Sequence, residues 1–255
     1  MSVTLSQLTG YLDECLQPQR FEDYCPNGLQ VEGGPQVGRL VTGVTACQLL
    51  LDAALDWGAD AILVHHGYFW RGESPCIVGM KRRRIAALLA SDVSLLAYHL
   101  PLDGHPEFGN NARLGQLMGL ELERHEPLQP EVAGSVGNIA SLPEAAAAGD
   151  LVARLQDITG RDALHVGESG AAVSRIAWCT GGAQDYIEAA VAAGADMFVT
   201  GEVSEQTVHI AREEGIHFVA AGHHATERYG VQALGDHLAE HFPLEHRFID
   251  IDNPV

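Results

Sequence analysis

Apolar positions along the chain follow two patterns: a helical spacing of three to four residues, and short continuous apolar runs typical of buried strands. Helices are predicted over residues 4–16, 48–57, 81–90, 112–118, 143–159, 185–193 and 205–214, and a last helix begins near residue 225. Strands are predicted over residues 40–45, 61–64, 93–98, 176–179, 197–200 and 216–221, with short candidates around Asn138 and His165. Because strands and helices alternate, we expect an α/β fold.

The order of elements in the first half of the chain recurs in the second half. Gly58-Ala59-Asp60 precedes one apolar strand, and Gly194-Ala195-Asp196 precedes the corresponding later strand. We therefore predict an internal duplication with two similar α/β lobes, residues 1–120 and residues 121–255. The alternative is that a common strand-helix pattern occurs twice without a duplication.

The composition is that of a globular protein. The 46% hydrophobic content of the 255 residues is sufficient for buried cores without covalent cross-links. The five cysteines include no Cys-x-x-Cys pair, which argues against a disulfide framework and a thiolate zinc cluster. No apolar stretch is long enough to span a bilayer, and the N-terminus lacks the pattern of a signal peptide. We expect a cytoplasmic protein with no membrane partner.

The formal net charge of −19 makes most of the surface repel polyanions, so a nucleic-acid duplex is not expected as a partner. The one basic run, Lys81-Arg82-Arg83-Arg84, opens a predicted helix. A solvated helix face is the simpler interpretation of this run, and a phosphate-attracting patch is the alternative.

Three polar clusters follow apolar strands at the points where the strands end. They are Val64-His65-His66-Gly67, Tyr98-His99-Leu100-Pro101-Leu102-Asp103 and Gly222-His223-His224-Ala225-Thr226-Glu227. Imidazole and carboxylate groups bind borderline divalent cations, and ligands of open α/β sheets gather outside the carboxyl ends of strands. We predict a metal site in a cleft between the two lobes, with ligands from both halves.

Each cluster also has a purely structural interpretation. His223 and Glu227 are four residues apart and would share one helix face as a chelating pair, but Glu227 would equally stabilise a helix start. The adjacent His65 and His66 would point to opposite faces unless the chain turns at Gly67, and one buried and one exposed histidine is the alternative. The occurrence of three such clusters favours the metal site.

The remaining polar residues near these clusters carry weaker signals. Asp103 lies in a turn-forming context, so it is a candidate metal ligand only because it occurs together with the other polar clusters. His99 and His105 are candidates for proton transfer or for orienting a ligand. Asn110-Asn111 is interpreted as a helix N-cap and Gly181–Asp185 as a strand-to-helix turn, neither of which has P-loop spacing.

The clusters belong to a longer series of motifs. The series is Asn27–Gly33, His65–Trp70, Tyr98–Asp103, Gly109–Asn111, Thr180–Asp185, Thr200–Glu202 and Gly222–Arg228. In the order and spacing of these motifs, over almost its whole length, the chain resembles the GTP cyclohydrolase 1 type 2 homologue family, the YbgI-like dinuclear-metal proteins.

The resemblance implies a toroidal homohexamer of two-lobed subunits, with two divalent metal ions in each subunit. It implies that His65 and His223 bind one ion. It implies that His66 and Asp103 bind the other, and that Glu227 bridges both. His224 is not a ligand in the family, and the chain lacks the large domain that some members carry between the lobes.

A metal-dependent hydrolase is the first functional hypothesis, because two adjacent ions lower the pKa of a bridging water and polarise the electrophile. The family name implies a cyclohydrolase whose small-molecule substrate is GTP or a related purine nucleotide. In such an enzyme we expect His99 to be the proton shuttle, and Glu202, which the duplication places at the equivalent strand end, to contact the substrate. The alternatives are a hydrolase of another nucleotide, a phosphoester or an amide, and a non-enzymatic metal-binding or partner-binding ring. Zinc, iron and manganese all suit these ligands, so the sequence does not identify the metal.

Overall fold

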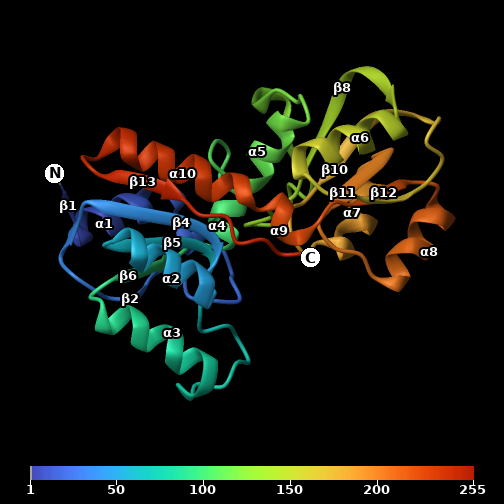
Figure 1. Ribbon diagram of the computed structural model, residues 1–255. Coiled ribbons are helices and arrows are strands. Elements are labelled where there is room, and N and C mark those ends of the chain that lie inside the picture. The colour runs from blue at the N-terminus through green and yellow to red at the C-terminus, as the bar shows by residue number, and fades with distance from the viewer. Residues whose placement is uncertain (1) are drawn as a thin grey trace. The chain divides into compact units, whose positions relative to one another are not determined.

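The structure, a computed structural model, describes residues 2–255, which form two units (Figure 1). Unit 1 comprises the described residues through Leu102 together with Gly230–Asp252, and unit 2 comprises Asp103–Tyr229 and Asn253–Val255. This division differs from the predicted one, which placed a single boundary between residues 120 and 121. The chain passes into unit 2 at Asp103, and residues Gly230–Asp252 return to unit 1, where strand β13 (Glu245–Phe248) pairs in parallel with β4 (Arg39–Thr45).

Unit 1 is built on a five-stranded sheet with the order β13-β4-β5-β6-β2. Strand β5 spans Ala61–His66, β6 spans Ser94–Ala97 and β2 spans Gly28–Val31. The first four strands in this order are parallel, and β2 pairs antiparallel with β6 at the edge. Strands β1 (Val3–Thr4) and β3 (Gln36–Val37) form a separate antiparallel pair.

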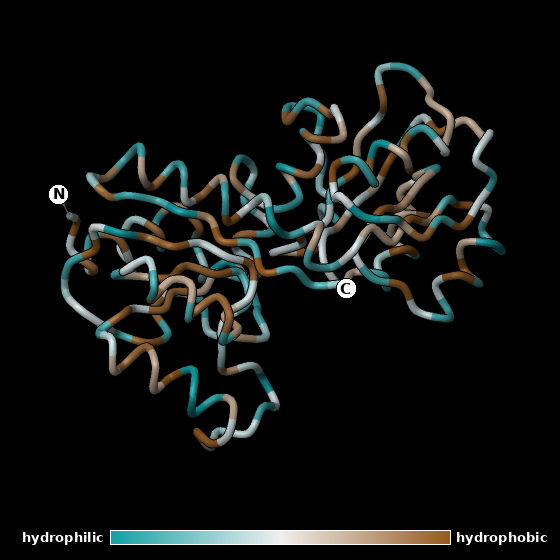
Figure 2. Tube along the Cα trace, viewed as in Figure 1, coloured by the Kyte–Doolittle hydropathy of each residue, from teal (hydrophilic) through white to brown (hydrophobic). Residues whose placement is uncertain are grey.

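Helices cover both faces of this sheet (Figure 1). On one face lie α2 (Gln48–Trp57) and α3 (Gly79–Ala90), whose apolar side chains pack on those of β4, β5 and β6. On the other lie α1 (Leu5–Leu16) and α10 (Arg228–His241). The strands are therefore apolar along most of their length, as the colouring in Figure 2 shows, and polar residues such as His65 and His66 stand at their carboxyl ends.

Unit 2 contains a six-stranded sheet with the order β7-β8-β10-β11-β12-β9. Its strands are β7 (Glu126–Pro127), β8 (Asn138–Ala147), β9 (Leu164–Val166), β10 (Ala172–Trp178), β11 (Met197–Thr200) and β12 (His217–Ala220). Strands β10, β11 and β12 are parallel, whereas β8 and β9 pair antiparallel with the outer two of them.

The helices of unit 2 also lie on both faces of its sheet (Figure 1). One face carries α5 (Asn110–Leu117) and α6 (Ala148–Thr159), which pack over Trp178 and its neighbours. The other carries α7 (Ile187–Ala192) and α8 (Glu205–Glu214). Shorter helical turns are η1 (Pro18–Arg20), α4 (Leu100–Asp103), η2 (Leu122–Arg124), η3 (Gln184–Tyr186) and α9 (His223–Thr226).

The predicted α/β fold is confirmed, but one predicted helix is wrong in its first part. The alanine-rich segment up to Ala147 belongs to strand β8, and the helix begins only at Ala148. The segment is extended because Ala146 and Ala147 pair with Val173 and Ala172 of β10. Sheet pairing thus overrides the helix propensity of alanine.

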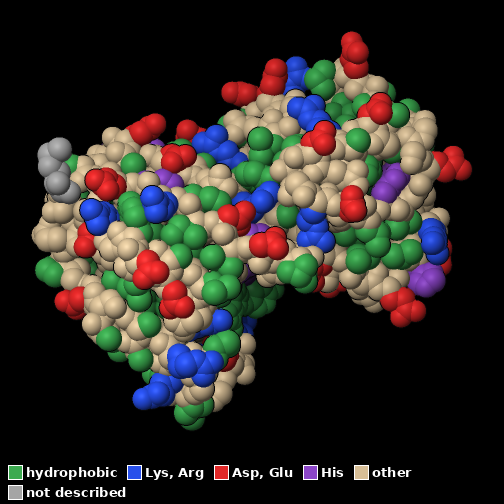
Figure 3. Space-filling model, viewed as in Figure 1, with side chains coloured by type: hydrophobic (Ala, Val, Ile, Leu, Met, Phe, Trp, Pro, Cys, Tyr) green, Lys and Arg blue, Asp and Glu red, His purple; other side chains and the backbone are tan. Residues whose placement is uncertain are grey.

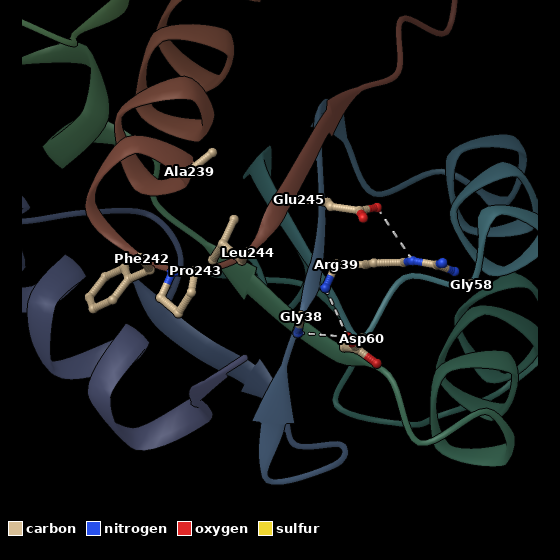
Figure 4. A pocket seen from close by; sticks show the side chains of 9 residues that line it. All are labelled: Gly38, Arg39, Gly58, Asp60, Ala239, Phe242, Pro243, Leu244 and Glu245. Carbon is tan, nitrogen blue, oxygen red and sulfur yellow. Dashed lines mark hydrogen bonds and ion pairs between the residues drawn. The ribbon is translucent and has the colours of Figure 1, made fainter. Parts of the chain in front are cut away.

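The two sheets share part of their topology, although the strand beyond β4 is parallel to it (β13) and the strand beyond β10 is antiparallel to it (β8). In each, three parallel strands (β4-β5-β6 and β10-β11-β12) are flanked by an antiparallel edge strand, β2 or β9. The repeated aspartates also make the same contacts. Asp60 Oδ2 accepts hydrogen bonds from the backbone N–H groups of Gly38-Arg39 at 2.7 and 2.8 Å (Figure 4), and Asp196 Oδ2 accepts from those of Ser174-Arg175 at 2.7 and 2.9 Å.

The surface carries charges of both signs. Asp and Glu side chains are scattered over the face seen in Figure 3, and Lys and Arg gather over α3. Lys81 of that basic run is buried, with Nζ 2.8 Å from Glu73, whereas Arg82 and Arg83 are exposed, as expected for a solvated helix face. The five cysteines all lie among the described residues, and none of them forms a disulfide there. No helix in residues 2–255 is long and apolar enough to cross a bilayer.

Candidate metal centre

Strand β5 carries His65 and His66 to its carboxyl end in unit 1. His65 is buried, and its Nδ1 lies 3.1 Å from the carbonyl oxygen of Tyr98, so Nδ1 bears the proton and donates. His66 is half-buried, and its Nδ1 lies 3.1 Å from Thr45 Oγ1. The two ring centroids are only 4.6 Å apart, so the histidines come together rather than pointing to opposite faces.

The turn that follows the histidines depends on Gly67. A Cβ at this position would collide with Gln30 Oε1 and would lie 2.6 Å from the Cβ of Ala97. Gln30 cannot withdraw cheaply, because its Oε1 accepts a hydrogen bond from the backbone N–H of Tyr68 at 2.7 Å. Glycine at position 67 therefore allows the close approach of β5, β2 and β6 that places the histidine pair.

A third histidine joins this pair within unit 1. His99 follows strand β6, and its ring centroid lies 5.0 Å from that of His65 and 5.6 Å from that of His66. Each of the three rings offers one nitrogen, and these nitrogens lie within 4.8 Å of one another. A set of imidazole nitrogens at this separation fits a borderline divalent cation such as zinc, iron or manganese.

In unit 2, Asp103 is held by polar side chains that surround it. It is 6% exposed, and its Oδ1 accepts hydrogen bonds from Asn110 Nδ2 at 2.8 Å and from Thr180 Oγ1 at 3.3 Å. Asn111 donates to the Asp103 carbonyl at 3.3 Å and accepts from the Thr180 N–H at 3.0 Å. The predicted N-cap role of Asn110-Asn111 is wrong, since Gly109 occupies the N-cap and both amides face inward.

His223 and Glu227 also meet in unit 2, as their spacing predicts. His223 Nε2 lies 3.2 Å from Glu227 Oε2, and its Nδ1 lies 2.6 Å from Glu202 Oε1. They do not lie on one helix, because α9 ends at Thr226 and α10 begins at Arg228. Burial lowers the pKa of His223, but the two carboxylates outweigh this effect and raise it to about 9.

The loop after β10 shapes the position of Glu227. Gly181 has φ +72°, and a Cβ there would collide with Glu227 Oε1. The backbone N–H of Gly181 donates to Thr226 Oγ1 at 3.0 Å, which joins this loop to α9. The segment predicted as a simple strand-to-helix turn therefore also supports a candidate ligand.

Glu202, predicted as a substrate contact, is found against His223, and the two other histidines in these clusters serve local roles. His105 Nδ1 accepts hydrogen bonds from the N–H groups of Glu107 and Phe108 at 3.2 and 3.0 Å. The backbone N–H of His224 donates to the carbonyl of Val255 at 3.0 Å, and its side chain is buried.

Sequence reasoning missed a contact to His99. Asp23 Oδ1 lies 2.7 Å from His99 Nδ1, and Cys25 lies in the same group, with ligand atoms of the three residues within 4.8 Å of one another. Burial would raise the pKa of Asp23, but the hydrogen bond from His99 and those from Asn27 and Tyr24 lower it to about 2. Burial and the Asp23 charge raise the pKa of Cys25 to about 12, so its thiol stays protonated. An isolated aspartate in a turn-rich segment has no spacing that marks it.

Comparisons with known proteins follow the motifs. The model of the Duf34/NIF3 (NGG1p interacting factor 3) family matches residues 3–254. A GTP cyclohydrolase 1 type 2 homolog of Pseudomonas aeruginosa is 59% identical over 255 residues, covering 100% of both chains. The homolog of that name from Escherichia coli (strain K12) is 52% identical over 254 residues, covering 98% of this chain and 99% of the other.

Two solved structures agree with these matches. Protein ybgI, described as of unknown function, superposes with a TM-score of 0.93 at 48% identity, covering 99% of this chain and 100% of the other. TTHA1606 from Thermus thermophilus superposes with a TM-score of 0.87 at 33% identity, with the same coverage. The resemblance drawn from the motifs is confirmed by these relatives.

Proposed function

Because the chain belongs to the Duf34/NIF3 family, we propose that it is a divalent-metal-dependent hydrolase with two ions in each subunit. The observation that carries the proposal is the gathering of ligand groups at strand ends in both units. Unit 1 brings the rings of His65 and His66 to within 4.6 Å of one another, centroid to centroid, at the end of β5. Unit 2 places a nearly inaccessible carboxylate, Glu227, 3.2 Å from the imidazole of His223.

The proposed ligands come from both units. His65 and His223 would hold one ion, His66 and Asp103 would hold the other, and Glu227 would be the ligand shared by both. Each unit contributes side chains of the required kind, imidazoles in unit 1 and an imidazole and carboxylates in unit 2. The donor chemistry fits as well, since the bond from His65 Nδ1 to Tyr98 makes Nε2 the nitrogen with a lone pair for a cation.

Bound in this way, a pair of ions supplies a water of lowered pKa and a Lewis acid. The protein's own contribution is to hold the ligands in place. Glu202 orients His223 through Nδ1, and Asn110 and Thr180 hold the carboxylate of Asp103. His99 is the proposed proton carrier, because it is the imidazole next to His65 and His66 that is not in the proposed ligand set.

The proposed substrate is GTP or a related purine nucleotide. The relatives' name gives one reason, and the surroundings of His99 give another. The ring of Tyr24, which is 58% exposed, lies 6.4 Å from the His99 ring, and the ring of Trp70 lies 5.0 Å from it. The Arg71 guanidinium lies 5.9 Å from the Tyr24 ring. Aromatic rings stack on bases, and a guanidinium pairs with phosphate.

A turnover assay tests the proposal. Protein loaded separately with zinc, iron(II) or manganese is incubated with GTP. Opening of the imidazole ring is measured as a loss of the purine absorbance. Glu227→Gln should abolish turnover and lower the bound metal measured by elemental analysis. Glu205→Gln, which changes an exposed carboxylate on α8, should leave both unchanged. Intact GTP and intact other nucleotides, phosphoesters and amides after prolonged incubation with fully loaded protein would refute the hydrolase.

We also propose that the chain acts in the cytoplasm as a homohexamer, without a nucleic-acid duplex as partner. The support is the family membership and the net charge of −19, which disfavours polyanions. Sedimentation velocity should show one species at six times the chain mass. A monomer or dimer at micromolar concentration in the presence of metal would contradict this assembly.

A further inference from the structure

The carboxylate of Asp23 is held on both of its oxygens. Oδ1 accepts hydrogen bonds from His99 Nδ1 at 2.7 Å and from the Tyr24 N–H at 2.6 Å. Oδ2 accepts from Asn27 Nδ2 at 2.8 Å and from the Leu100 N–H at 2.9 Å. The side chain is only 4% exposed, so these four donors, all within unit 1, fix its position.

His99 is held by the same network at its backbone as well as at its ring. Its N–H donates to Asn27 Oδ1 at 2.7 Å, and Asn27 in turn donates to Asp23. Because the anionic Asp23 accepts from Nδ1, the neutral imidazole carries its proton on Nδ1. Nε2 is then the nitrogen with the available lone pair.

The ring of His99 lies among the side chains of the candidate metal centre. Its centroid is 5.0 Å from His65 and 5.6 Å from His66, and the Trp70 ring meets it edge-on at 84°. With Nδ1 committed to Asp23, Nε2 is the ring nitrogen that remains to act on a reacting group. A buried carboxylate that holds one imidazole nitrogen so that the other acts on a reacting group is a recurring arrangement in hydrolytic sites.

We infer that Asp23 is the positioning residue of His99, fixing its ring orientation and its tautomer so that Nε2 accepts a proton during hydrolysis. The inference rests on the proposed function. A proton passes from the attacking water to Nε2, and Nε2 then returns it to the leaving atom, so the ring ends each turnover as it began. Cys25 does not compete for this role, because its thiol stays protonated.

The first test compares four variants: Asp23→Asn, Asp23→Ala, His99→Gln and Asp60→Asn. Asp60 is the matched control, since it is a carboxylate of the same unit that also accepts backbone N–H groups but precedes β5 rather than following it. Both Asp23 variants and His99→Gln should lower kcat by about 100-fold or more, with KM and bound metal little changed. Asp60→Asn should leave kcat unchanged.

The second test does not depend on activity. In zinc-loaded protein labelled with 15N-histidine, long-range 1H–15N spectra report the tautomer of each ring, and His99→Gln identifies the signals of His99. The wild-type ring should be protonated on Nδ1. Asp23→Asn should shift the population toward the Nε2–H tautomer, because the asparagine amide can donate to Nδ1. Asp60→Asn should leave the His99 signals unchanged.

These readouts separate the two claims. Failure to find a substrate refutes the proposed hydrolase, whereas the spectra still test the link from Asp23 to His99. An unchanged His99 tautomer in both Asp23 variants overturns the positioning role. A loss of one bound metal ion in His99→Gln shows that Nε2 is a metal ligand, and this result overturns its role as proton acceptor.

Discussion

The Glu202 carboxylate lies 2.6 Å from Nδ1 of His223, and Nε2 of the same ring lies 3.2 Å from Glu227. One imidazole is therefore oriented by one carboxylate and presented to another. Glu202 follows β11 and His223 follows β12, so two neighbouring parallel strands deliver the pair. In metal sites, a carboxylate on the outer nitrogen of a histidine fixes the tautomer and makes the ligating nitrogen more basic.

Glu202→Gln should accordingly weaken metal binding by about 10- to 100-fold, because the amide cannot supply the negative charge that favours a basic Nε2. Competition with a chromophoric chelator measures this affinity. Glu205→Gln, on the exposed first turn of α8, is the control and should bind metal like the wild type. Equal affinities for the Glu202 and Glu205 variants would show that His223 needs no such partner.

Gly181→Ala should lose metal affinity through Glu227. The added Cβ collides with Glu227 Oε1, and the backbone has φ +72°, so the variant combines a displaced carboxylate with backbone strain. Gly160→Ala isolates the strain, because Gly160 has φ +71° and an added Cβ would have no neighbouring atom within 4 Å. The Gly160→Ala control should lower the free energy of unfolding by about 1 kcal/mol and keep full metal affinity. Equal metal affinities in the two variants would contradict the predicted displacement of Glu227.

Periodicity predicts the elements that carry the site where local signals agree with packing. Helix α2 ends at Trp57, since Gly58 takes the left-handed conformation with φ +77°, and α8 ends before Gly215 for the same reason. Strand β11 is short, apolar and fully buried, so its bounds follow from composition alone. The histidine pair and the His223–Glu227 pair then follow as the polar residues at strand ends.

The remaining features depend on contacts that no local pattern encodes. Residues up to Ala147 have a helical composition, and only their pairing with β10 makes them a strand. The return of residues Gly230–Asp252 to unit 1 depends on the pairing of β13 with β4, which is distant in sequence. Asp23 reaches His99 across 76 positions, so its contact arises from the fold rather than from spacing.

The stability of unit 1 should fall on acidification because of His246. Its side chain is 6% exposed, its Nδ1 lies 2.9 Å from Asp236, and its Nε2 accepts from the Thr42 hydroxyl at 2.8 Å. Burial lowers the pKa of His246 and outweighs the opposing effect of Asp236. The folded state therefore favours the neutral ring. This contribution is fully present above the unfolded pKa of about 6.5 and is lost as the pH falls through the lower folded pKa.

His246→Gln should reduce the loss of stability between pH 7.5 and pH 5, measured as free energies of unfolding in urea. At pH 7.5 it should cost about 1 kcal/mol, since the hydrogen bond to buried Thr42 is weakened. His209→Gln on α8, where the histidine is exposed, should keep the wild-type pH dependence. Parallel pH profiles for wild type and His246→Gln would contradict the assignment.

The two repeated aspartates, Asp60 and Asp196, should stabilise their units by similar free energies of unfolding. Asp60 and Asp196 each accept two backbone N–H bonds, and in each unit the arginine that follows the first donor also binds a carbonyl, that of Trp57 at 3.2 Å or that of Ala193 at 2.9 Å. In unit 1 these contacts line a cavity of about 570 Å³ (Figure 4). Asp60→Ala and Asp196→Ala should each lower the free energy of unfolding by about 1–2 kcal/mol, because two amides lose a charged acceptor that is partly open to water.

The effects of the two substitutions should add in the double variant to within about 0.5 kcal/mol, since the sites share no partner. Asp56→Ala, at an exposed position of α2, is the control for removing an acidic charge, and urea unfolding followed by amide exchange in each unit assigns the losses. A large effect of one aspartate beside none of the other would show that the matching contacts have diverged in energy although they agree in geometry.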